Sequence, residues 1–219
     1  MDKLEIKEVH KSFGKRLILN QIQLECGIGE TIGIFGRNGS GKSTLFKIMF
    51  GVLKADQFQG YVNNKAIHSN AFAKKMIGYL PQDGFLPGDI KVRDLIAMVH
   101  PNGDVQNRIF YAPGVHSFDH KWVGLLSAGE LKYLEFLLVC FLDHPFLLLD
   151  EPFSMIDPLY HEVIKEIIQT IGKTKGILLT DHYYEDVLQV TSRNFVLKNG
   201  DLIPIESRKD LARYGYIPS

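Results

Sequence analysis

The sequence predicts an α/β fold with a mainly parallel sheet, an N-terminal antiparallel β subdomain and a small inserted lobe. Three short runs, at residues 31–35, 146–149 and 177–180, are almost wholly apolar, as in strands buried on both faces. Each is followed along the chain by a segment with helical spacing of apolar residues. Buried strands that alternate with helices indicate an α/β core. Alternating residues before the first buried strand indicate the additional antiparallel sheet.

The first part of the chain is predicted to contain strands and one helix. Residues 4–13 alternate as an edge-type strand does, and a second alternating run ends at a glycine-containing turn. The predicted helix at 42–50 carries apolar residues at helical spacing and stops at Gly51. In chain order the predicted strands are residues 4–13, 17–24, 31–35 and 76–80.

Residues 83–125 differ in character from the rest of the chain. Three of the nine prolines and four glycines fall between residues 83 and 123, with one predicted helix over residues 92–99. We interpret this segment as a small inserted lobe of helical type or an irregular loop region. With 219 residues, the chain has the length of a single domain, residues 1–219.

The second half of the chain is predicted to alternate helices and strands. Ser127 is a suitable N-cap and Glu130 stands at the third helical position, which predicts a capping box at the start of a buried helix. Asn199-Gly200 predicts a tight hairpin turn. The predicted helices are residues 127–142, 158–171, 183–190 and 208–214, and the predicted strands are 146–149, 177–180, 194–198 and 202–205.

Composition and charge narrow the function classes. Lys plus Arg and Asp plus Glu both number 25, so the chain lacks the basic excess of a nucleic-acid binder. The longest apolar run, residues 136–142, is far short of the ~20 residues that cross a bilayer, and the N-terminus has no signal-peptide core. Cys26 and Cys140 fit small buried side chains in a reducing compartment. We therefore expect a cytoplasmic protein with no nucleic-acid partner, in which any membrane role needs a separate partner.

The strongest chemical signal is a glycine-rich segment that matches the phosphate-loop pattern G-x-x-x-x-G-K-[ST] between a predicted strand and a predicted helix. Its residues are Gly36, Arg37, Asn38, Gly39, Ser40, Gly41, Lys42 and Ser43, with Thr44 following. The three glycines permit backbone conformations closed to other residues, so that successive N–H groups face one anion. Lys42 is expected to reach the β- and γ-phosphates and Ser43 to ligate Mg²⁺. The segment thus predicts a phosphate-loop NTPase core that binds ATP; the alternative is a glycine-rich turn with a surface lysine.

A second signal is the apolar strand that ends in Asp150 and Glu151. Carboxylates at the carboxyl end of a strand lie where α/β sheets bind ligands. Asp150 is expected to hold Mg²⁺, and Glu151 is expected to polarise the attacking water as general base. The alternative is a strand that enters a polar turn, but the phosphate loop upstream favours the functional interpretation.

With further motifs in the same order, the chain resembles the ATP-binding-cassette (ABC) ATPases over nearly its whole length. The segment from Leu126 to Glu130, LSAGE, resembles the family signature LSGGQ. Four more residues match family positions: Phe13 the adenine-stacking aromatic, Gln82 the Q-loop glutamine, Asp157 the D-loop aspartate and His182 the switch histidine.

The resemblance implies a role for each matching residue. Phe13 would stack on adenine, Gln82 would act in catalysis as a ligand of Mg²⁺ and water, and His182 would contact the γ-phosphate. The nucleotide would also be contacted by Ser127, Gly129, Glu130 and Asp157. Each role has a simpler alternative: a core aromatic, a polar turn residue, a structural histidine, or a helix cap.

The resemblance also implies partners. In this family the signature caps ATP on the phosphate loop of the opposite subunit, which implies a head-to-tail homodimer or a pair with a related ATPase subunit. A separate transmembrane permease would hold the chain at the inner face of the membrane. The residues around Asp150 and His182 are most similar to those of ATPases of lipopolysaccharide-export or branched-chain amino-acid type.

The chain departs from the family pattern within and after the signature. Ala128 replaces the first signature glycine, Glu130 replaces the glutamine, and residues 131–136 lack the usual arginine-rich, alanine-containing run. These departures leave the choice of permease open. Two alternatives to a transport ATPase remain: a soluble ABC-family ATPase not coupled to transport, and a nucleotide-responsive scaffold without useful hydrolysis, against which Glu151 and His182 argue.

Overall fold

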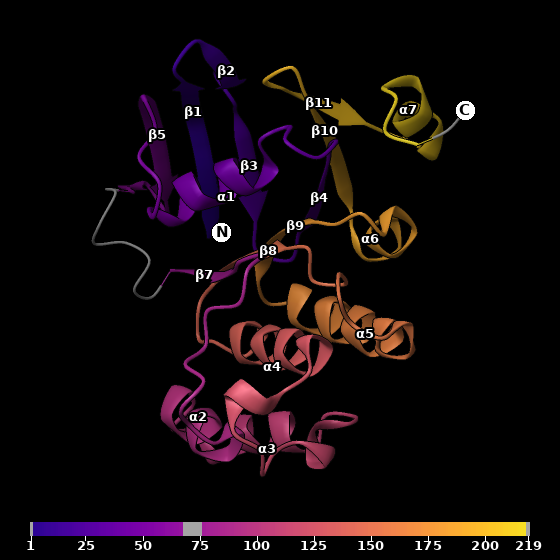
Figure 1. Cartoon of the computed structure of the whole chain (residues 1–219). Helices are drawn as coiled ribbons and strands as arrows, with labels where there is room; N and C mark the ends of the chain where they lie inside the picture. Colours follow the sequence, from indigo (N-terminus) through magenta and orange to yellow (C-terminus); the bar gives the residue numbers. More distant parts are fainter. Residues whose placement is uncertain (1, 68–75, 218–219) are drawn as a thin grey trace.

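The α/β class is confirmed by the computed structural model, which describes residues 2–67 and 76–217 (Figure 1). Its strands are β1 Lys3–Phe13, β2 Arg16–Leu19, β3 Leu24–Gly27, β4 Thr31–Phe35, β5 Gln57–Val62, β6 Lys65–Ala66, β7 Ile77–Leu80, β8 Phe146–Asp150, β9 Gly176–Thr180, β10 Arg193–Lys198 and β11 Asp201–Ile205. Its α-helices are α1 Lys42–Phe50, α2 Val92–Val99, α3 Gly103–Phe110, α4 Ala128–Cys140, α5 His161–Gly172, α6 Tyr184–Val190 and α7 Arg208–Arg213. No helix in these described residues is long and apolar enough to span a membrane.

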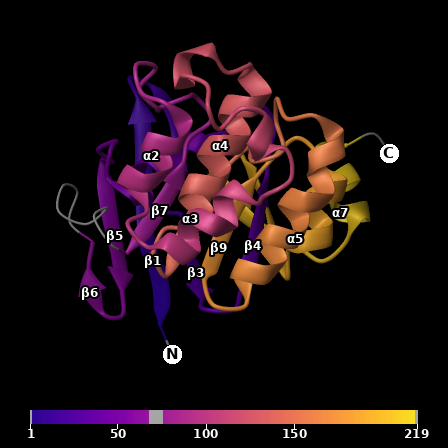
Figure 2. The same cartoon turned by 90° about the horizontal axis from the view of Figure 1, so that it is seen from below.

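A central sheet in the order β11-β10-β4-β9-β8-β7 carries the core. All of its neighbouring pairs are parallel except β10 with β11. Side chains alternate between its two faces, so Leu147 and Leu149 join the apolar cluster of α4 and α5, whereas Leu148 joins that of α1. Figure 2 shows α4 and α5 over the strands of this sheet. Because the parallel strands run the same way, the loops that follow β4, β7, β8 and β9 lie at one edge.

The second sheet is antiparallel and corrects two expectations. β1 is its central strand, paired with β5 on one side and with β3 and β2 on the other, so the prediction of an edge strand was wrong. The alternating run predicted at residues 17–24 is split into β2 and β3, because Gln21 between them has a left-handed backbone with φ 49°. Strand β5 was not predicted, because its two glutamines and Gly60 leave few apolar residues to form an alternating apolar–polar pattern.

The segment of residues 83–125 contains two helices rather than one. Helix α2 has the predicted bounds. Helix α3 was not predicted, because among its residues only Ile109 is buried and the polar remainder gives little helical pattern. The side chain of Asn102 caps α3 by accepting a hydrogen bond from the Asp104 N–H at 2.8 Å. In Figure 1, α2 and α3 lie beyond α4, at the end of the molecule opposite the antiparallel sheet. That this segment is a separate lobe of a single domain stays a prediction.

The helix after the signature starts as predicted. The Ser127 hydroxyl accepts from the Glu130 N–H at 3.2 Å, and the Glu130 carboxylate accepts from the Ser127 N–H at 2.8 Å. This reciprocal capping box satisfies backbone N–H groups at the N-terminus of α4 and fixes where the helix begins. The helix predicted at 158–171 differs in its first turn, which is a 3₁₀ turn at Pro158–Tyr160 before α5.

Candidate active site

The glycine-rich loop joins the carboxyl end of β4 to the start of α1, as the pattern predicts. Gly39 and Gly41 have left-handed φ angles of 74° and 110°, which other residues rarely adopt. Gly36 is needed for a different reason: its φ is not left-handed, but a side chain there would come within 2.8 Å of the Leu197 backbone oxygen. The loop therefore curls tightly enough for its N–H groups and the N-terminus of α1 to surround an anion.

Lys42 and Ser40 point their polar groups into this loop. The Lys42 ammonium donates to the backbone oxygens of Gly36 at 2.6 Å and Arg37 at 3.4 Å. Burial lowers the pKa of Lys42, against the opposing effect of Glu151, Asp150 and Asp181. The Ser40 hydroxyl is buried and has no hydrogen-bond partner among the described residues. A buried hydroxyl without a partner is costly, and a phosphate oxygen is a suitable acceptor for it.

A cavity of about 240 Å³ lies over the loop. It is lined by Asn38, Gly39, Ser40, Gly41, Lys42, Ser43, Thr44, Gln82 and Glu151. The structure thus brings most of the predicted phosphate loop together with two residues from distant parts of the sequence. A second cavity that the loop also borders is lined by Arg16 and, near the end of the chain, by Tyr214, Gly215 and Tyr216.

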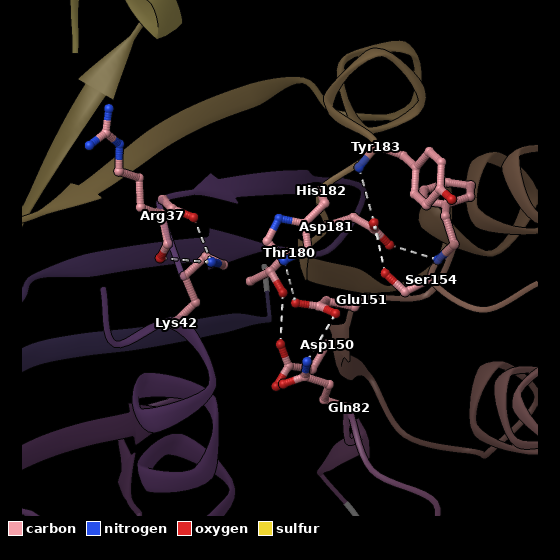
Figure 3. Close-up of polar contacts among 12 residues, drawn as sticks. Arg37, Lys42, Gln82, Asp150, Glu151, Ser154, Thr180, Asp181, His182 and Tyr183 are labelled. Atoms are coloured by element: carbon pink, nitrogen blue, oxygen red, sulfur yellow. Dashed lines mark hydrogen bonds and ion pairs between the residues drawn. The ribbon is translucent and has the colours of Figure 1, made fainter. Parts of the chain in front are cut away.

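Asp150 is fully buried at the end of β8. One of its carboxylate oxygens accepts a hydrogen bond from the Thr180 hydroxyl at 2.8 Å (Figure 3). The other accepts from the Tyr79 hydroxyl at 3.4 Å. Burial, followed by the nearby Asp150 charge, raises the pKa of Tyr79 above its ordinary value, so Tyr79 remains a donor. Strands on both sides of β8 therefore fix the orientation of this carboxylate.

Glu151 contacts more of the predicted catalytic residues than any other described residue of the site. Its backbone is left-handed, with φ 56°, and its N–H donates to the Thr180 backbone oxygen at 2.8 Å. Its side chain lies between two other predicted residues: Gln82 Nε2 donates to one carboxylate oxygen at 3.1 Å, and His182 Nε2 is 3.0 Å from the other (Figure 3). Glu151 therefore contacts both of the other residues with predicted catalytic roles, Gln82 and His182.

Asp181 and Tyr216 carry no predicted role, yet both support the site. Asp181 accepts hydrogen bonds from the N–H groups of Phe153 at 2.7 Å and Tyr183 at 3.1 Å, so it ties the loop after β8 to the loop after β9. Burial raises its pKa. The Tyr216 hydroxyl donates to the Asp181 backbone oxygen at 2.9 Å, and burial raises the Tyr216 pKa to about 12. A carboxylate directly after a buried strand was the one sequence signal for Asp181; Tyr216 had none.

Nine predicted residues do not line the cavity over the loop. Gly36 and Arg37 belong to the loop itself, and Asp150 and His182 are described above; the other five stand elsewhere. Phe13 is 51% exposed on the β1–β2 hairpin, opposite Arg16, whose guanidinium donates to the Gly39 backbone oxygen at 3.3 Å. Asp157 caps the 3₁₀ turn by accepting from the Leu159 N–H at 3.0 Å. The remaining three, Ser127, Gly129 and Glu130, stand at the start of α4, where a side chain on Gly129 would come within 3.0 Å of the Met155 backbone oxygen.

The arrangement joins an anion-binding loop to a carboxylate base. The hydroxyl of Ser43, the amide of Gln82 and the carboxylate of Asp150 are oxygen donors of the kind that Mg²⁺ prefers. Together with the partnerless Ser40 hydroxyl, they fit a magnesium-bound triphosphate better than a neutral ligand. Water activated by Glu151 beside that triphosphate would attack phosphorus, so the geometry suits hydrolysis.

Comparison with known proteins agrees with this geometry. Residues 19–154 match the family profile described as ABC transporter. The lipopolysaccharide export system ATP-binding protein LptB of Escherichia coli K12 is 29% identical over 216 residues, which cover 93% of this chain and 90% of that protein. The protein of the same name from Acidithiobacillus ferridurans is 26% identical over 220 residues, covering 95% and 91%.

Solved structures share the fold. A structure described as an ATP-binding subunit of an ABC transporter matches with a TM-score of 0.83 at 19% identity, covering 96% of this chain and 92% of that one. A dimeric bacterial ABC transporter cassette matches with a TM-score of 0.80 at 19% identity, covering 91% and 96%.

Proposed function

The chain belongs to the ABC transporter family as an ATP-binding and ATP-hydrolysing subunit, and on that premise we propose how its residues act. The phosphate loop and Lys42 bind the phosphates, and Glu151 accepts a proton from the attacking water. Gln82 and His182, in contact with the two oxygens of Glu151, orient that carboxylate toward the γ-phosphate. The observation that carries the proposal is this contact of three residues beside the loop.

Magnesium would be held by Ser43, Gln82 and Asp150. When bound, it neutralises charge on the phosphate oxygens. Hydrogen bonds from Thr180 and Tyr79 hold the Asp150 carboxylate in a fixed orientation. Phe13 would stack on adenine from the edge of the β1–β2 hairpin.

We further propose that the working unit is a head-to-tail pair. Ser127, Gly129, Glu130 and Asp157 lie outside the phosphate-loop cavity of their own chain. Exposed Met155 and Leu159, in the segment after Glu151, are apolar groups suited to a subunit interface. A two-fold pair of this chain would place each signature over the partner's phosphate loop. A related ATPase subunit would satisfy the same geometry.

The pair would drive a separate permease and sit peripherally at the inner face of the membrane. Similarity to LptB over 93% of the chain favours a permease of lipopolysaccharide-export type.

The test of a permease partner is to purify the chain, with an affinity tag, from membranes of its own organism. Stoichiometric recovery of an identified multi-span membrane protein that alters the rate of ATP hydrolysis is expected. Recovery of active enzyme from the soluble fraction alone would favour the alternative of a family member not coupled to transport.

A further inference from the structure

Helix α4 contains two buried charges one turn apart, in the stretch that departs from the family pattern. Lys132 is 4% exposed and Glu135 is 1% exposed. Removing a charge from water is costly unless the group is well hydrogen-bonded. Neither side chain forms a close ion pair within the described parts of the chain. Two effects offset the cost of burial: the two charges attract each other, and each side chain is hydrogen-bonded to the backbone.

Lys132 donates hydrogen bonds to the backbone of two segments, the loop after β7 and the end of β8. Its ammonium is 2.7 Å from the Pro81 oxygen and 3.3 Å from the Gln82 oxygen, which belong to the loop after β7. It is also 3.4 Å from the Asp150 oxygen, at the peptide that leads into Glu151. One ammonium therefore bridges the backbones that carry Gln82 and Glu151.

Glu135 holds the other end of the same loop. Its carboxylate accepts a hydrogen bond from the Phe85 N–H at 2.8 Å. Lys132 thus binds carbonyl groups at residues 81 and 82, and Glu135 binds an N–H group three residues later. Both belong to the helix that starts at Ser127, so a movement of that helix carries the Gln82 loop with it.

We propose that Lys132 and Glu135 are positioning residues that hold the Gln82 loop so that the Gln82 amide reaches Glu151. They also couple the loop to the signature end of α4. This inference rests on the proposed role of Glu151 and adds two residues to it. Because neither residue touches the phosphate loop, their loss acts on turnover rather than on nucleotide affinity.

The test compares Lys132→Met with Lys175→Met. Lys175 is a matched control: its ammonium also donates to two backbone oxygens, those of Leu142 at 2.7 Å and His144 at 2.6 Å. It lies just before β9, at the end of the sheet away from the loop. We expect Lys132→Met to lower kcat at least about tenfold with KM for ATP changed less than about threefold. Lys175→Met should keep kcat within about twofold of the wild type.

The results distinguish failure of the proposed function from failure of the positioning role. If the wild type fails to release phosphate from Mg²⁺-ATP, the proposed function falls. If the wild type is active and Lys132→Met matches it, or Lys175→Met loses as much, the positioning role falls.

Thermal melts show whether each variant folds. If Lys132→Met does not fold, Glu135→Ala decides: kcat should drop with KM kept, whereas wild-type kcat would overturn the proposal. Restoration of kcat in Lys132→Arg would support the role, since arginine can donate to the same carbonyl groups.

Discussion

Glu151 adopts a strained backbone conformation that places its carboxylate in the candidate active site at a cost to the stability of the folded chain. A left-handed backbone with φ 56° costs a glutamate on the order of 1 kcal/mol or more. The turn nevertheless directs the side chain between Gln82 and His182, and the Thr180 backbone oxygen holds its N–H. Strain of this kind is found where the surrounding structure fixes a functional group, and it fits the role of general base.

His182 should matter for turnover more than for binding. His182→Ala removes the group 3.0 Å from Glu151 and leaves the phosphate loop intact, so kcat should fall about 100-fold with KM for ATP nearly unchanged. Steady-state phosphate release measures both constants, with the exposed His116→Ala as control. A His182→Ala enzyme within about threefold of the wild-type kcat would assign the histidine a structural role only.

Motif residues could be located from the sequence, but their supports could not. Gln82, Glu151 and His182 each follow a predicted strand, and parallel strands bring those ends together. Lys132 and Asp181 were not given roles, because their importance arises from backbone groups that approach only in the folded chain. For Phe13 and Asp157, the sequence suggested nucleotide contact, whereas a single chain shows only their local surroundings.

At the scale of elements, the start of α4 combines a capping box with residues that are proposed to contact the nucleotide. Burial alone would raise the pKa of Glu130, but hydrogen bonds from Lys121 at 2.8 Å and from Ser127 lower it overall. A carboxylate whose pKa is lowered on folding adds stability above its unfolded pKa and loses that contribution as the pH falls through its folded pKa. The ionised capping box therefore stabilises the folded chain at neutral pH.

Glu130→Gln should make that contribution visible. At pH 7 the variant should be less stable than the wild type by about 0.5 kcal/mol, a small value because solvent screens this partly exposed pair. The difference should shrink below pH 4.5, the ordinary pKa of the group. Urea unfolding at pH 7 and near pH 3.5 measures it. An equal difference at both pH values would contradict an electrostatic origin.

Prediction succeeded for elements with a strong pattern and failed for those without one. Helix α2 and the buried strands combine dense apolar patterns with clear ends. Helix α3 buries a single residue, and β5 takes its partner from a strand about fifty residues earlier. Such elements depend on tertiary contacts more than on their own residues.

At the scale of the molecule, the proposed pair requires each chain to contribute two incomplete halves of an ATP site. The phosphate loop and Glu151 stand at the edge of the central sheet, whereas the signature begins α4 and packs against the segment after Glu151. In the proposed pair, closure would bring the partner's signature over ATP, and hydrolysis would release it. In this pair, ATP itself is expected to join the two copies of the chain.

The most direct test is the mass of Glu151→Gln in solution. This variant keeps the phosphate loop but lacks the base, so with Mg²⁺-ATP it should run in size-exclusion chromatography with light scattering at twice the 24.8 kDa of one chain. Without nucleotide it should run as one chain, and Lys42→Ala should do so even with ATP. The variant should release almost no phosphate. A Glu151→Gln protein that stays monomeric with ATP, or that hydrolyses ATP at the wild-type rate, would contradict the account.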